Sequence, residues 1–148
     1  MATLKEQLLV PDVRPSLVKD CCTCIDEEVA SKRGLKAVAL KGAYKTVKAI
    51  RRGFVEGAVD VLLDEFVAEL ESYYAEYLSA GASSFSTHLD QSRAVVAESL
   101  LKVTDIRASK SKHKTAVKMY QRLRTSAKTH VEVALPRLGQ VIQRHLKG

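Results

Sequence analysis

Apolar residues recur at intervals of three and four positions along almost the whole chain, which is the periodicity of amphipathic helices. No stretch alternates apolar and polar residues over six positions with β-branched enrichment, so no strand is predicted. Only ten of the 148 residues are Gly or Pro. The pattern predicts an all-α fold, a single compact bundle of six to seven helices that forms one domain over residues 1–148.

Capping residues, glycines and prolines predict where the helices begin and end. We expect a short first helix that stops before Pro11 and a loop over residues 81–84. The segment 107–112 is either a linker or the start of the sixth helix. The first five expected helices cover approximately residues 3–10, 15–33, 35–52, 54–79 and 85–105. The sixth is expected to end near residue 124, and the seventh to run from residue 127 to the end of the chain.

The fourth and last of these helices carry the broadest apolar faces and are expected at the centre of the bundle. Leu35 and Ala43 are expected to face inward from the third helix, and Val95 from the fifth. Pro136 lies inside the apolar stripe of the last helix. Because proline lacks a backbone N–H and clashes with the preceding turn, we expect a kink or break there.

Charge is distributed unevenly along the sequence. The chain has a formal net charge of +7, but residues 1–53 carry +5, residues 54–101 carry −8 and residues 102–148 carry +10. Basic residues at helical spacing form two rows in the positive blocks. The rows are Lys41, Lys45, Lys48 and Arg52 in the third helix, and Lys110, Lys114, Lys118 and Arg122 in the sixth.

Like charges four residues apart destabilise a helix by about 0.2–0.5 kcal/mol per pair, so the rows require an explanation. Carboxylates of the fourth helix could neutralise them, or the rows could be solvated faces. A polyanion could also relieve the repulsion through phosphate contacts that ignore sequence and weaken with salt. Anionic lipid is less favoured, because the apolar face of the third helix has no Trp or Phe to anchor it.

Three cysteines, Cys21, Cys22 and Cys24, lie within four residues of one predicted helix. A zinc site needs four ligands, usually as pairs from separate segments, and no second cysteine pair exists. Cys21 and Cys22 fall on the apolar stripe of the helix, so we interpret the cluster as core packing, with metal binding or redox chemistry as the alternative. The odd number of cysteines argues against a disulfide framework and favours a reducing, cytoplasmic location.

His145 and His130 lie at the centre and edge of the last apolar stripe. No Ser, Asp or Cys motif near them supplies a nucleophile or acid partner, so packed and hydrogen-bonded histidines are expected. No Glu precedes a His by three residues, and no glycine-rich phosphate loop is present. The sequence therefore offers no catalytic residues, no metal ligands and no cofactor site, and we expect a protein that is not an enzyme.

Several stretches resemble a family of small bacterial proteins of unknown function. They are Ser126–Glu132, Ala134–Leu138, Arg144–Leu146, Gly53–Asp60 and Val103–Arg107. The resemblance spans most of the chain, implies a free-standing bacterial domain, and implies no activity, cofactor or partner. The cysteine cluster is not among the matching stretches.

The leading functional hypothesis is a non-catalytic interaction protein that binds another protein, or a second copy of itself, through a helical face. The alternative is polyanion binding through the two rows, with nucleic acid favoured over an anionic membrane surface. No small-molecule substrate is predicted.

Overall fold

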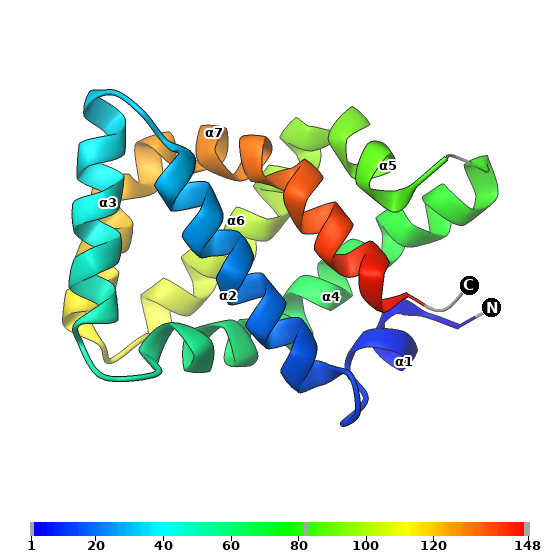
Figure 1. Ribbon diagram of the computed structural model, residues 1–148, viewed down its shortest axis with the longest axis horizontal. Coiled ribbons are helices and arrows are strands. Elements are labelled where there is room, and N and C mark those ends of the chain that lie inside the picture. Colours follow the sequence, from blue (N-terminus) through cyan, green and yellow to red (C-terminus); the bar gives the residue numbers. More distant parts are fainter. Residues whose placement is uncertain (1, 82, 147–148) are drawn as a thin grey trace.

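The computed structural model describes residues 2–81 and 83–146, which form seven helices and no strand (Figure 1). The all-α prediction is thus confirmed. Ala82, in the predicted loop before the fifth helix, lies outside the described residues. The helices are α1 (Leu4–Leu8), α2 (Arg14–Ser31), α3 (Leu35–Lys48), α4 (Phe54–Ala80), α5 (Phe85–Gln91), α6 (Arg93–Lys110) and α7 (Lys114–His145).

The two longest helices, α4 and α7, organise the bundle, because each of the other five helices packs against both of them. The expectation that the fourth and last helices lie at the centre is confirmed. They supply seven members of the main hydrophobic core, which are Leu63, Val67, Leu70, Tyr74, Leu135, Val141 and Ile142. Figure 1 shows α3 and the start of α7 at one end of the molecule, and α1 with the end of α7 at the other.

Helix α3 stands outside the main core cluster. Its fully buried residues are the small side chains Ala37 and Ala43, whereas Leu35 is 92% exposed. The inward orientation expected for Leu35 is therefore wrong, and the one for Ala43 is confirmed. The helix also ends at Lys48, four residues before the predicted end, and Gly53 follows at a positive φ of 76° that only glycine adopts at little cost.

The predicted fifth helix is divided at Ser92 into α5 and α6. Ser84 caps α5, because its Oγ accepts a hydrogen bond from the Thr87 N–H, and Phe85 and Leu89 are completely buried. After the turn, α6 continues to Lys110, and it buries Val96, also expected inward, but leaves Val95 61% exposed. The inward orientation expected for Val95 is therefore wrong.

Helix α7 is a single helix across the predicted boundary near residue 125 and across Pro136. Ion pairs from Arg124 to Asp105 and from Lys128 to Glu98 hold consecutive turns against α6, so the boundary is absent. Pro136 does not break the helix, because packing fixes the chain on both sides of it. Its carbonyl accepts a hydrogen bond from the Ser86 hydroxyl, and the preceding Leu135 is completely buried. Figure 1 shows α7 as a bent helix.

Close packing of α5 on α7 generates a stability prediction at Gly139, where an added Cβ would lie 2.5 Å from the Ser86 Cα. Gly139→Ala should lower the free energy of unfolding by about 1–3 kcal/mol, because the backbone of α5 must move away. Gly42→Ala is the matched control, since a Cβ there meets nothing within 4 Å in the middle of α3. It should raise stability by about 1 kcal/mol. Urea denaturation measures both, and equal stability of Gly139→Ala and the wild type would contradict this packing.

Candidate functional site

All eight residues of the two predicted basic rows are exposed, but the rows differ from the sequence prediction at their ends. Arg52 lies in the turn after α3 instead of on the helix. Lys110 is the last residue of α6, and Lys114 is the first of α7. The prediction that these two lysines share a helix is wrong, because residues 111–113 leave the helical conformation between them.

Five of the seven carboxylates of α4 lie against other parts of the molecule and form no ion pair with the rows. Arg14 of α2 donates to Asp60 and Asp64 at 2.8 and 2.9 Å. Glu71 accepts the backbone N–H groups of Leu4 and Lys5, at the start of α1. Two further contacts join α4 to its neighbours, since Glu65 forms an ion pair with Arg107 and the Glu76 Oε2 lies 3.7 Å from the His88 Nε2. The acidic helix thus fastens the first two helices and the α5–α6 segment.

Within the described residues, Lys48 is the only member of the two rows that has a carboxylate partner. Its Nζ lies 3.4 Å from the Asp26 Oδ1. The remaining seven have none in that part of the chain, and they are Lys41, Lys45, Arg52, Lys110, Lys114, Lys118 and Arg122. The rows are therefore solvated positive surfaces, not internally neutralised ones.

Helix α3 packs against α7, and Figure 1 shows it beside the first half of that helix and running in the opposite direction. At one end of this pair, His130 of α7 is close enough to Lys32 and Lys36 for their charges to affect it. At the other end, the Phe54 and His113 rings meet edge to face with their centroids 5.1 Å apart. The C-terminal end of the α3 row and the N-terminal end of the α7 row therefore converge where the α3–α4 and α6–α7 connections lie side by side.

We call this convergence the basic corner, formed by residues 49–53 and 110–114. It contains two arginines, three lysines and a histidine, which are Arg51, Arg52, Lys110, Lys112, Lys114 and His113. The guanidinium of Arg51 lies over the Phe54 ring, 5.5 Å from its centroid. None of the six has a carboxylate partner within the described part of the chain.

Sequence reasoning missed Arg51, Lys112 and His113, because it considered only cations at four-residue spacing. A different signal marks them in the sequence. No acidic residue occurs in residues 29–55 or in residues 106–131, and these two segments together hold 16 of the 24 Lys and Arg residues. The fold places the two acid-free segments against each other in the α3–α7 pair.

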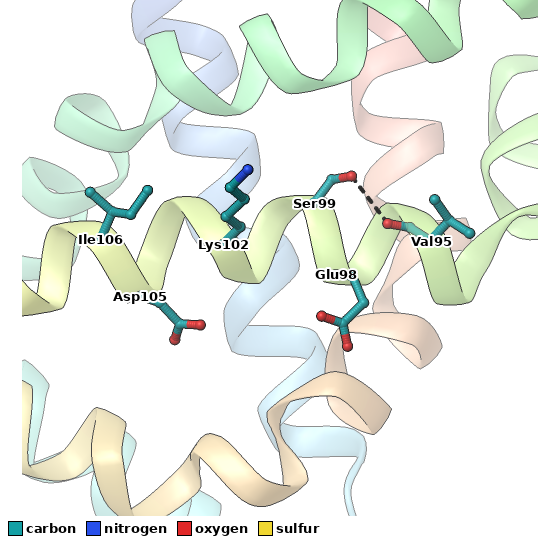
Figure 2. A pocket seen from close by; sticks show the side chains of 6 residues that line it. All are labelled: Val95, Glu98, Ser99, Lys102, Asp105 and Ile106. Atoms are coloured by element: carbon teal, nitrogen blue, oxygen red, sulfur yellow. Dashed lines mark hydrogen bonds between the residues drawn. The ribbon is translucent and has the colours of Figure 1, made fainter.

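A separate depression lies on α6, lined by Val95, Glu98, Ser99, Lys102, Asp105 and Ile106. Figure 2 shows the two carboxylates on one side of the helix, and Lys102 and Ile106 on the other. Asp105 accepts hydrogen bonds from Tyr120 and Arg124, which lower the pKa of its carboxyl group, with Arg124 the larger cause. Val95 and Ile106 are 61% and 45% exposed, so the depression combines apolar and charged groups.

The cysteine cluster belongs to the hydrophobic core, as predicted. The inward pair differs from the prediction, because Cys22 and Cys24 are the core members, whereas Cys21 is only partly buried and packs against the core. Burial raises the pKa of Cys21 to about 12 and of Cys24 to about 11, and it also raises that of Cys22. All three are free thiols, and the uncharged form dominates at neutral pH.

Of the two histidines on the last apolar stripe, His145 is hydrogen bonded, as predicted. Its Nε2 lies 2.7 Å from the Asp20 Oδ2 and links the end of α7 to α2. The expectation for His130 is wrong, because its buried Nε2 has no hydrogen-bond partner. Burial, followed by the nearby charges of Lys32 and Lys36, lowers its pKa.

The described residues also bear on metal binding and membrane insertion. No group of three or more His, Cys, Asp or Glu side chains among them is placed to hold a metal ion. None of the helices in the same part of the chain combines the length and hydropathy needed to cross a bilayer.

A family model described as a family of unknown function (DUF6918) matches residues 4–146. This agrees with the resemblance found in the sequence. No curated protein and no solved structure matches the chain.

The raised thiol pKa values generate a reactivity prediction. Because the thiolate is the nucleophile, a disulfide reagent at pH 8 should react with Cys24 on the order of a hundredfold, and with Cys21 on the order of a thousandfold, more slowly than with free cysteine. Unfolding in urea should expose all three thiols and restore ordinary rates. Absorbance of the released thiol measures both, and a folded protein in which Cys21 or Cys24 reacts as fast as free cysteine would contradict the assigned burial.

Proposed function

The chain belongs to this family of unknown function, and we propose from its own geometry that it binds nucleic acid through phosphate contacts on the basic corner and the two adjoining rows. The observation that carries the proposal is the convergence of two acid-free segments, with seven of the eight predicted row residues unpaired among the described residues. Such a surface attracts a polyanion and gains entropy when condensed counterions are released from the nucleic acid.

The side chains of this surface are suited to phosphates more than to base edges. The chain contains no asparagine, and Gln121 is the only glutamine in the two acid-free segments. These amides are the residues that pair with adenine in the major groove, whereas lysines on exposed helices make contacts that carry no sequence information. We therefore propose binding that does not depend on base sequence.

The proposed function is binding without a catalytic step. Its location is proposed to be the cytoplasm, a reducing compartment in which the three free thiols would persist.

This proposal reverses the order of the two sequence-based hypotheses. A protein partner would require a continuous apolar face, but the exposed large apolar side chains are spread over four helices. They are Leu35 and Val38 on α3, Val61 on α4, Val95 and Ile106 on α6, and Val133 on α7. The unpaired cations, in contrast, gather where two connections meet.

Contact with another protein chain remains a second candidate, because the α6 depression exposes Val95 and Ile106 beside charged groups (Figure 2). The simplest such partner is a second copy of this chain. If so, sedimentation velocity should show association that increases with concentration and is lost in V95S/I106S. A monomer at every concentration would remove self-association from consideration.

The main proposal is tested by binding of a fluorescent DNA duplex across a salt series. Neutralising the α7 row in K114Q/K118Q/R122Q should reduce the slope of log K against log salt by about 2.7, because three phosphate contacts are lost. The substitutions also remove two like-charge pairs, so the variant should melt no lower than the wild type.

K5Q/K19Q/K102Q is the matched control, because it removes the same net charge at exposed positions outside the basic surface. Its slope should equal that of the wild type. The variant L35S/V38S distinguishes nucleic-acid binding from lipid binding. The two exposed apolar residues that it replaces would contribute to contact with a membrane and not to contact with phosphates. Absence of duplex binding at low salt, or equal losses in K114Q/K118Q/R122Q and K5Q/K19Q/K102Q, would refute the proposal.

A further inference from the structure

We infer that the ligand of the basic surface is double-stranded nucleic acid, and that unpaired strands bind it more weakly. This inference rests on the proposed function and adds the class of nucleic acid to it. It is based on two observations. The aromatic side chains of the two acid-free segments are buried or hydrogen bonded, and the cations are placed on a rigid helix.

Proteins that bind unpaired strands combine cations with exposed aromatic rings on which successive bases stack. The two acid-free segments contain three aromatic side chains, Tyr44, Phe54 and Tyr120. Phe54 is 8% exposed and is covered by His113 and Arg51. It therefore offers no free face to a base.

Both tyrosines are also held by neighbouring groups. Tyr44 is half-buried, donates a hydrogen bond to Asp26 of α2 and has the Lys48 Nζ 5.1 Å from its ring centroid. Tyr120 is half-buried and donates to Asp105 at 2.6 Å. Within the described residues, the basic surface therefore provides cations without a fully exposed tyrosine or phenylalanine ring, and the imidazole of His113, which is exposed, already packs edge to face on Phe54.

A surface that binds through charge alone favours the ligand with the higher charge density. A duplex carries one phosphate charge per about 1.7 Å of its axis and releases about 0.9 counterions for each neutralised phosphate, against about 0.7 for a single strand. The cations themselves are fixed on a rigid scaffold. Lys114, Lys118 and Arg122 repeat along one uninterrupted helix and span about 12 Å. Such a row matches the regular backbone of a duplex, whereas a flexible strand must lose conformational entropy to follow it.

The test compares a duplex with a single strand of the same length, at equal phosphate concentration and 50 mM salt. For about six contacts, the duplex should bind roughly tenfold or more tightly, with a salt slope steeper by about 1. Equal or tighter binding of the single strand overturns the inference and leaves the proposed function intact. Absence of binding by both ligands overturns both.

Tyrosine fluorescence gives a second readout, because the chain has five tyrosines and no tryptophan. A saturating concentration of the single strand should leave the tyrosine emission unchanged, since no tyrosine ring of the basic surface is free to stack on a base. Strong quenching would show base stacking and contradict the inference.

Gln121→Trp supplies the missing ring, because Gln121 is exposed on α7 between Lys118 and Arg122. It should increase affinity for the single strand about five- to a hundredfold and leave duplex affinity unchanged. Gln121→Leu is the matched control and should change neither affinity. An equal gain for both ligands in Gln121→Trp would contradict the inference, because paired bases expose no free face.

Discussion

The contact between α3 and the first half of α7 is the constraint on which the basic surface of this molecule depends. It joins two segments that contain 16 of the 24 basic residues and no acidic residue. Small residues make this contact possible, since Ala37 and Ala43 are the fully buried residues of α3. The basic residues of α3 and of the first half of α7 therefore repel each other. Packing must offset this repulsion, or an external anion must relieve it.

Carboxylates are present in sufficient number, but the fold uses them elsewhere. Those of α4 bind Arg14, Arg107 and the start of α1. The carboxylates of α6 bind the middle of α7, through Arg124 and Lys128. These pairs stabilise the helices around the core and leave the cations of the basic corner without an ion pair among the described residues, and the carboxylate nearest to Gly53 in the corner is that of Glu56. The separation of charge along the sequence thus becomes a separation of charge in space.

Much of the fold could be predicted from the sequence, because helical periodicity, capping residues and glycines act locally. The capping box at Thr3, the start of α4 after Gly53 and its end before Gly81 follow from such signals. The errors occur where tertiary contacts decide the outcome. The unbroken α7 depends on Asp105 and Ser86, which lie on other helices. The site was predicted only in part, because four-residue spacing identifies rows within a helix and not the meeting of two connections in space.

The central claim is that the phosphates of a duplex cover the basic corner and its two rows. Acetylation of lysines with and without duplex, followed by mass spectrometry, tests it most directly at the level of single residues. The account predicts protection of Lys45, Lys112, Lys114 and Lys118, with unchanged modification of Lys5, Lys19 and Lys102. Protection of the second group, or uniform modification of both groups, would contradict it.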